Sequence, residues 1–177
     1  MSAKKDLKKL MSGKLPEPSE LRAQFEAMDD DTDRAIGVVS VAIIEAILQR
    51  LLEVRLKGQS PEVRNGLFLN RGPLSDFHGK ILVAVGFDVA SAGIGDELMN
   101  IKAIRNAFAH STMNIGFDTP EIVGLLRESK ILQIIAGPPE PSDGGTYGKI
   151  GFLKLAKILC LVLNSAITEA GGDPVYH

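Results

Sequence analysis

The stretch from Asp29 to Lys57 constrains the fold of this chain more than any other. Its apolar residues recur at steps of three and four, which places them on one face of an α-helix. The members of this row are Ile36, Val39, Ile43, Ile47, Leu51 and Val54. Acidic residues at 29–33 provide N-cap candidates, and Lys57-Gly58 ends the helix. Because the part from Ala35 to Leu48 is apolar almost all round, we expect a central helix that is covered on more than one side.

Further helices are expected in the middle of the chain. A turn at 70–73 precedes a second helix, and a small-residue connection at 86–95 leads to a third, with Asp96 and Glu97 in its first turn. The expected buried row of this third helix is Leu98, Ile101, either Ile104 or Arg105, and Phe108. Thr119-Pro120 then supplies the N-cap and first position of a short helix.

The C-terminal part contains one ambiguous segment and one clear helix. The run from Ile131 to Ile135 has Ile on both faces, so it fits a strand or a buried helical turn, and we favour an extended segment near 131–136. Residues 137–145 are rich in Pro and Gly, which indicates a surface loop. A last helix is expected at about 148–170, ended by Gly171-Gly172. Its inward residues are expected to be Phe152, Leu155, Leu159, Val162 and Ala166.

The length of 177 residues and the apolar content of 45% fit one domain with a hydrophobic core. We therefore predict an all-α fold, a single-domain helical bundle of about five main helices. Residues 1–28 are expected to form a flexible basic arm, 29–170 the helical domain and 171–177 a C-terminal tail. The arm carries few apolar residues, which favours a solvated end over a phosphate-binding or membrane-surface helix.

Charge and composition exclude several classes of protein. A net charge of −2 gives no strong field toward nucleic acid or anionic lipid, so any such contact must be local. Lys154 and Lys157 interrupt the most apolar segment, and no membrane span is expected. No apolar run suited to secretion follows the basic N-terminus, and Cys160 lies in an apolar run as expected of a buried, reduced thiol. These features predict a cytoplasmic protein.

Cofactor and metal sites are not expected either. His78, His110 and His177 are widely separated in the sequence, and Cys160 is the single cysteine that could offer a thiolate to a metal. The glycines do not form a Gly-x-Gly-x-x-Gly pattern after a strand. The sequence also lacks the pattern of a helix-turn-helix motif, which needs a surface-exposed recognition helix. We therefore do not expect sequence-specific binding to DNA.

The segment Arg105-Asn106-Ala107-Phe108-Ala109-His110 carries most of the chemistry. An advance of about 100° per residue places Lys102, Asn106 and His110 in one row, with Arg105 at its border. An Arg can grip a phosphate, an amide can position it and a His can move a proton, so Arg105, Asn106 and His110 are candidate catalytic residues with Lys102 in support. The alternative is a polar helix end in which Arg105 pairs with Glu45 or Asp96.

Glu45 is the second candidate residue. It lies among Ile43, Ile44, Ala46 and Ile47, and a carboxylate buried there needs a partner. We expect Arg105 or His110 to be that partner, so that Glu45 either orients the His or neutralises the Arg. The alternative is an exposed stripe shared with Gln49 and Glu53.

Several segments together resemble the bacterial mannitol operon repressor (MltR) family. They are Asp33-Arg34-Ala35-Ile36, Leu67-Phe68, Gly72-Pro73-Leu74-Ser75-Asp76-Phe77, Ile104 to His110, and Phe117-Asp118-Thr119-Pro120-Glu121-Ile122. Their order and spacing match from roughly residue 30 to 165, and the N-terminal arm lies outside. The resemblance implies an all-helical negative regulator of sugar uptake that lacks an evident DNA-reading element.

The segment Arg105 to His110 also resembles the signature of the HEPN superfamily, an Arg followed by four to six residues and a His. For active members this implies a helical dimer that cleaves RNA without metal, through attack by the ribose 2′-hydroxyl. By position, Arg105 would stabilise the phosphate, Asn106 would position it and His110 would be the general base or acid. Many relatives with the motif are binding or regulatory partners instead.

We therefore expect a transcriptional regulator of a sugar operon that acts through protein or nucleotide contacts. The alternative is a metal-independent ribonuclease or RNA-binding module that uses Arg105, Asn106 and His110. In both cases a homodimer is expected, with a protein partner or an RNA or nucleotide phosphate at the corner between Arg105 and His110.

Overall fold

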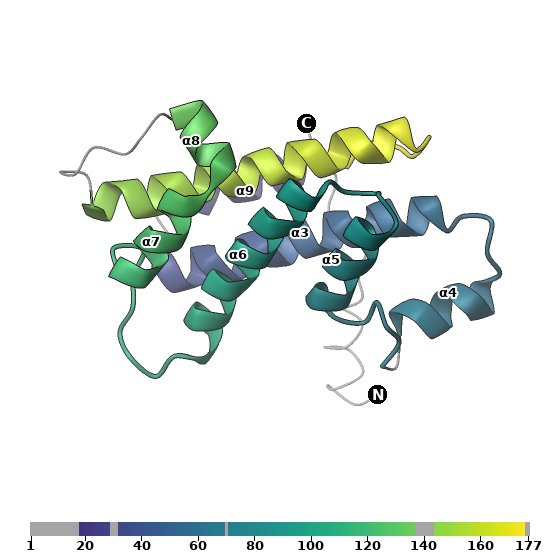
Figure 1. Cartoon of the computed structure of the whole chain (residues 1–177), viewed down its shortest axis with the longest axis horizontal. Coiled ribbons are helices and arrows are strands. Elements are labelled where there is room, and N and C mark those ends of the chain that lie inside the picture. Colours follow the sequence, from purple (N-terminus) through teal and green to yellow (C-terminus); the bar gives the residue numbers. More distant parts are fainter. Residues whose placement is uncertain (1–17, 29–31, 70, 137–143, 176–177) are drawn as a thin grey trace.

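The computed structural model describes residues 18–28, 32–69, 71–136 and 144–175. Within these ranges the chain forms eight helices and no strand, which confirms the all-α single domain (Figure 1). The helices are α2 Pro18–Ala27, α3 Asp33–Arg55, α4 Pro61–Phe68, α5 Phe77–Gly86, α6 Ala92–His110, α7 Pro120–Glu128, α8 Lys130–Ala136 and α9 Gly144–Glu169. Those that the sequence did not lead us to expect, α2, α4 and α8, have 10, 8 and 7 residues.

Helices α3 and α9 form the central pair of the bundle. They lie side by side and run in the same direction (Figure 1). At their C-terminal ends Gly172 lies against the side chain of Val54, and at the other end Gly148 and Asp33 both contact Phe117. The expected row on α3 is correct except at Val39, which is 42% exposed, while Ser40 beside it is buried. A helix that is apolar almost all round does not reveal from sequence which face meets solvent.

Helices α5 and α6 form a hairpin that packs on α3. The N-terminal end of α3 meets the C-terminal end of α6, where a Cβ at Gly37 would overlap with the ring of Phe108. The ring of Phe108 also meets that of Phe117 edge to face, with centroids 4.9 Å apart. The expected inward row of α6 is confirmed, since Leu98, Ile101, Ile104 and Phe108 are all buried.

The expected start of α6 was wrong. The helix begins at Ala92, inside the expected connection 86–95, because the hydroxyl of Ser91 accepts the N–H of Ile94 at 3.4 Å. Glu97, which we expected in the first turn, therefore lies beyond it and is buried.

The expected extended segment near 131–136 is a helix instead, α8. The hydroxyl of Ser129 accepts the N–H of Leu132 at 3.2 Å, and a carboxylate oxygen of Glu97 accepts the N–H of Ile131 at 3.3 Å. These bonds satisfy donors at the helix start, which a short apolar run alone does not provide. Thr119 is the N-cap residue of α7 as expected, but its hydroxyl accepts the N–H of Gly116 instead of capping α7.

Helix α9 starts earlier than expected, at Gly144, and most of the predicted loop 137–145 lies outside the described residues. Phe152, Leu155 and Leu159 are buried as expected. Val162 is 38% exposed, and Leu163 beside it is buried. Cys160 is buried and free, as expected, and burial raises the pKa of its thiol.

The predicted boundary of the N-terminal arm was placed too late in the chain. Residues from Pro18 form α2, and Phe25 and Met28 are buried in the common core. The hydroxyl of Ser40 donates to the sulfur of Met28 at 3.4 Å. The part of the expected arm at 1–17 lies outside the described residues. At the other terminus, Val175 donates its N–H to the side chain of Asn164 at 2.5 Å, which folds the tail back onto α9.

Two helical segments, Asp33–Arg55 and Tyr147–Glu169, are long and apolar enough to cross a membrane by length and composition. In each, 56% of the most apolar window is buried inside the domain. Core helices of soluble proteins meet the same criterion, so this finding is weak evidence for a membrane location.

Candidate functional site

A cavity of about 500 Å³ lies where the N-terminal end of α5 meets the middle of α6. Helix α3 contributes one carboxylate to its wall, and the turn before α5 contributes polar groups. The lining residues are Glu45, Ser75, Asp76, Phe77, His78, Lys102, Arg105 and Asn106. The cavity thus collects four of the five site residues that the sequence singled out, Glu45, Lys102, Arg105 and Asn106.

Helix α6 supplies the cationic wall of the cavity. Lys102, Arg105 and Asn106 are half-buried and share one side of the helix, since residues three and four apart are neighbours on its surface. Nη1 of Arg105 donates to Oδ1 of Asn106 at 3.0 Å. In the part of the chain that the structure describes, no ion pair joins Lys102 or Arg105 to a carboxylate. The alternative pairing of Arg105 with Glu45 or Asp96 is therefore not formed.

Glu45 has a buried partner, but not one that we expected. Nζ of Lys80 lies 2.7 Å from Oε1 of Glu45, and the two side chains are 5% and 22% exposed. The need for a partner was predicted correctly, whereas the choice of Arg105 or His110 was wrong. Helix α5 brings Lys80 to α3 from 35 positions along the chain. The signal that we overlooked is the single Lys directly before the apolar run 81–86, where its ammonium needs a carboxylate.

The start of α5 also lines the cavity. Oδ1 of Asp76 accepts the N–H of Gly79 at 2.9 Å and caps the helix. A Cβ at Gly79 would overlap with the carbonyl of Pro73, so the Gly-Pro turn and the helix start fit only with glycine there. His78 is exposed and lines the cavity beside this cap. His78 was given no role from the sequence, because the three His residues of the chain are widely separated along it.

His110 does not line this cavity. It is the last residue of α6 and is exposed. The cation that reaches the end of α6 is Arg34 of α3, whose guanidinium donates to the carbonyls of Phe108, Ser111 and Met113 at 2.6 to 3.3 Å. Arg34 thus binds the backbone on both sides of His110. The sequence offered no sign of this contact beyond the presence of Arg34 in a segment that resembles the MltR family.

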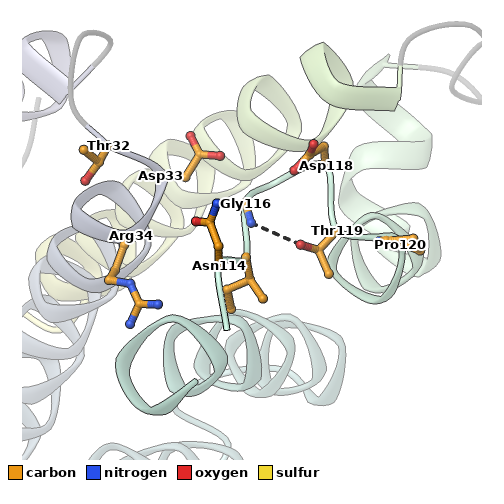
Figure 2. Close-up of a pocket in the computed structure, with 9 residues that line it drawn as sticks. Thr32, Asp33, Arg34, Asn114, Gly116, Asp118, Thr119 and Pro120 are labelled. Carbon is orange, nitrogen blue, oxygen red and sulfur yellow. Dashed lines mark hydrogen bonds between the residues drawn. The ribbon is translucent and has the colours of Figure 1, made fainter. Parts of the chain in front are cut away.

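A second cavity, of about 770 Å³, lies at that same end of the bundle (Figure 2). It is lined by Thr32, Asp33, Arg34, Asn114, Ile115, Gly116, Asp118, Thr119 and Pro120. In the view of Figure 2 the side chain of Asn114 lies between those of Arg34 and Thr119. Oδ2 of Asp33 accepts the N–H of Phe117 at 2.8 Å. Arg34, Asp33 and Thr119 all bind backbone groups, so they hold the loop after α6 in place.

Within the described ranges, no group of three or more His, Cys, Asp or Glu residues is placed to hold a metal ion. The expectation that the protein uses no metal and no cofactor remains a prediction.

No family model, curated protein or solved structure matches this chain. The resemblances to the MltR family and to the HEPN superfamily therefore remain proposals. We call the first cavity, which holds Lys102, Arg105 and Asn106, the α5–α6 cavity.

Proposed function

We propose that this protein is a cytoplasmic regulator that binds a phosphate group of a nucleotide or RNA in the α5–α6 cavity. The observation that carries the proposal is the side-by-side placement of Lys102, Arg105 and Asn106 along the cavity. Among the described residues, no carboxylate is bound to either cation. A guanidinium and an ammonium bind phosphate oxygens strongly when no other anion competes for them. The neighbouring amide can add a hydrogen bond to the same group.

The balance of charge around the cavity favours an anionic ligand. The lining contains two carboxylates, Glu45 and Asp76, and two cations, Lys102 and Arg105. A third cation, Lys80, lies outside the lining and is paired with Glu45. Three positive and two negative charges leave an excess of one positive charge, with His78 counted as neutral. Since the chain as a whole carries −2, this excess is local.

The resemblance to the MltR family supports a regulatory role. In this proposal the ligand-bound domain acts on a sugar operon through a protein partner, as a homodimer, and does not read DNA bases. Ligand binding in the α5–α6 cavity would change which surface of the domain is available to the protein partner.

Binding of inorganic phosphate and AMP to the full chain, measured by isothermal titration calorimetry, tests the proposal. Arg105→Ala and Lys102→Ala should each weaken binding by about tenfold or more, because each removes a charge-assisted contact. Lys154→Ala is the matched control, since Lys154 is exposed on α9 and does not line the cavity. A wild-type chain that binds neither compound at millimolar concentration contradicts the proposal.

A second candidate is the metal-independent ribonuclease, and the exposure of His110 favours it. His110 follows Asn106 by one helical turn, so a second copy packed against this end of α6 would join the imidazole to the phosphate-binding side chains. This function needs the homodimer. The test is cleavage of single-stranded RNA in EDTA, which His110→Ala should abolish while phosphate binding persists. Cleavage that survives in His110→Ala argues against it, and sedimentation measures the oligomeric state.

A further inference from the structure

We infer that Lys80 is a positioning residue that keeps Glu45 away from Lys102 and Arg105 and so keeps the α5–α6 cavity open to an anion. The inference rests on the proposed function, because it concerns how the phosphate site is kept vacant. Lys80 does not itself line the cavity.

Glu45 is the residue that decides whether Lys102 and Arg105 stay available to an anion. The side chain of Glu45 is 22% exposed and lines the same cavity as Lys102 and Arg105. A carboxylate that shares a partly buried wall with a guanidinium ordinarily pairs with it, often through two parallel hydrogen bonds. Such a pair would neutralise the site. Instead, Oε1 of Glu45 accepts from Nζ of Lys80 at 2.7 Å.

The difference in burial explains which cation Glu45 selects. The side chain of Lys80 is 5% exposed, whereas Lys102 and Arg105 are half-buried and reach solvent. An ammonium deprived of water costs far more free energy without a partner than a cation that water can solvate. Glu45 is the one carboxylate paired with Lys80 in the ranges that the structure describes. Glu45 therefore pairs with Lys80, and Lys102 and Arg105 stay available to a ligand.

Removing the ammonium of Lys80 should free Glu45 to pair with another cation. In Lys80→Met the methylene stem is replaced at similar volume, and Glu45 loses its partner. Its carboxylate should then turn to Arg105 or Lys102 and compete with the ligand. Phosphate affinity should fall by about tenfold or more, although the substituted residue is outside the cavity wall. Adding Glu45→Gln to this variant removes the competing charge and should restore the affinity to within about threefold of wild type.

The experiment is calorimetric titration of inorganic phosphate and AMP into four full-length proteins: wild type, Lys80→Met, Glu45→Gln and the double variant. Circular dichroism reports folding of each. If Lys80 only filled space, the melting temperature would change in Lys80→Met and in the double variant. Adding Glu45→Gln would then not restore phosphate affinity. Recovery on adding Glu45→Gln is thus the readout that separates positioning from packing. Lys80→Gln replaces Lys80→Met if the latter does not fold, and the same weakening is expected.

The outcomes are distinct. A wild-type chain that binds neither probe overturns both the proposed function and this inference. Wild-type binding together with unchanged affinity in Lys80→Met or Lys80→Gln overturns the inference and leaves the proposed function standing. Weakened binding that the double variant does not recover also overturns the inference, because the loss would then come from packing.

Discussion

The guanidinium of Arg34 donates to the carbonyl oxygen of Phe108 at 2.6 Å, across 74 positions of sequence. The same group also reaches the carbonyls of Ser111 and Met113. The last carbonyls of a helix have no partner within the helix, and a cation there is stabilised by the helix dipole. Arg34 therefore joins the start of α3 to the end of α6 and fixes the backbone that carries His110.

Removing this contact should destabilise the protein. Arg34→Ala is expected to lower the free energy of unfolding by about 1–2 kcal/mol, because several charge-assisted bonds to carbonyls are lost from a partly exposed position. Urea denaturation followed by circular dichroism measures the change. Arg55→Ala, an exposed cation in the last turn of α3, is the control and should change stability by about 0.5 kcal/mol or less. Equal effects of the two substitutions would show that Arg34 is an ordinary surface residue.

Gly37 marks the closest approach of α3 to α6. A Cβ there would overlap with the ring of Phe108, which is fully buried and has no room to move. Gly37→Ala should therefore destabilise the protein by about 1–3 kcal/mol, despite the higher helix propensity of Ala. Gly124→Ala in α7 is the matched control, since no atom lies within 4 Å of a Cβ there. It should be neutral or stabilising by about 0.5–1 kcal/mol, and thermal denaturation of both variants checks the difference in sign.

Cys160 should be unreactive in the folded protein. Burial raises the pKa of its thiol well above the ordinary range, so the nucleophilic thiolate is scarce at pH 8. A disulfide reagent such as DTNB should label it only after urea is added. The pKa of the thiol is higher in the folded than in the unfolded protein. The stability that the buried neutral thiol contributes is therefore complete below about pH 8.5, the pKa of the unfolded state, and is lost as the pH rises above it. Rapid labelling without denaturant would contradict the burial of this side chain.

Glu97 should control the order of α8. The residue is 3% exposed, and its Oε1 accepts hydrogen bonds from the hydroxyl of Ser129 at 2.9 Å and from the N–H of Ile131. Glu97→Ala removes both bonds and leaves buried donors unpaired, which should cost about 2 kcal/mol. Hydrogen exchange of the amides in α8 should accelerate more than that of α3. The exposed Glu128→Ala serves as control, and uniform acceleration across the chain would mean that Glu97 stabilises the whole domain instead.

The long helices α3, α6 and α9 were predictable because their apolar rows are local patterns that repeat over several turns. Among the short helices, α7 was expected from Thr119-Pro120, and α4 has the same kind of start, Ser60-Pro61, which we overlooked. Helices α2 and α8 depend on packing and on bonds from distant residues more than on their own sequence. The bond from Glu97 to the start of α8 is an example. It connects residues 34 positions apart, and no local pattern announces it.

For the candidate site, the sequence alone determined the residues of α6. The spacing of Lys102, Arg105 and Asn106 places them on one side of any helix that contains them, whatever surrounds it. Their partners were decided by the tertiary structure. Lys80 reaches Glu45 because α5 folds against α3, and Arg34 reaches the end of α6 because α3 and α6 run in opposite directions. Helix geometry is set by neighbours along the chain, whereas charge pairing is set by which buried groups the fold brings within hydrogen-bonding distance.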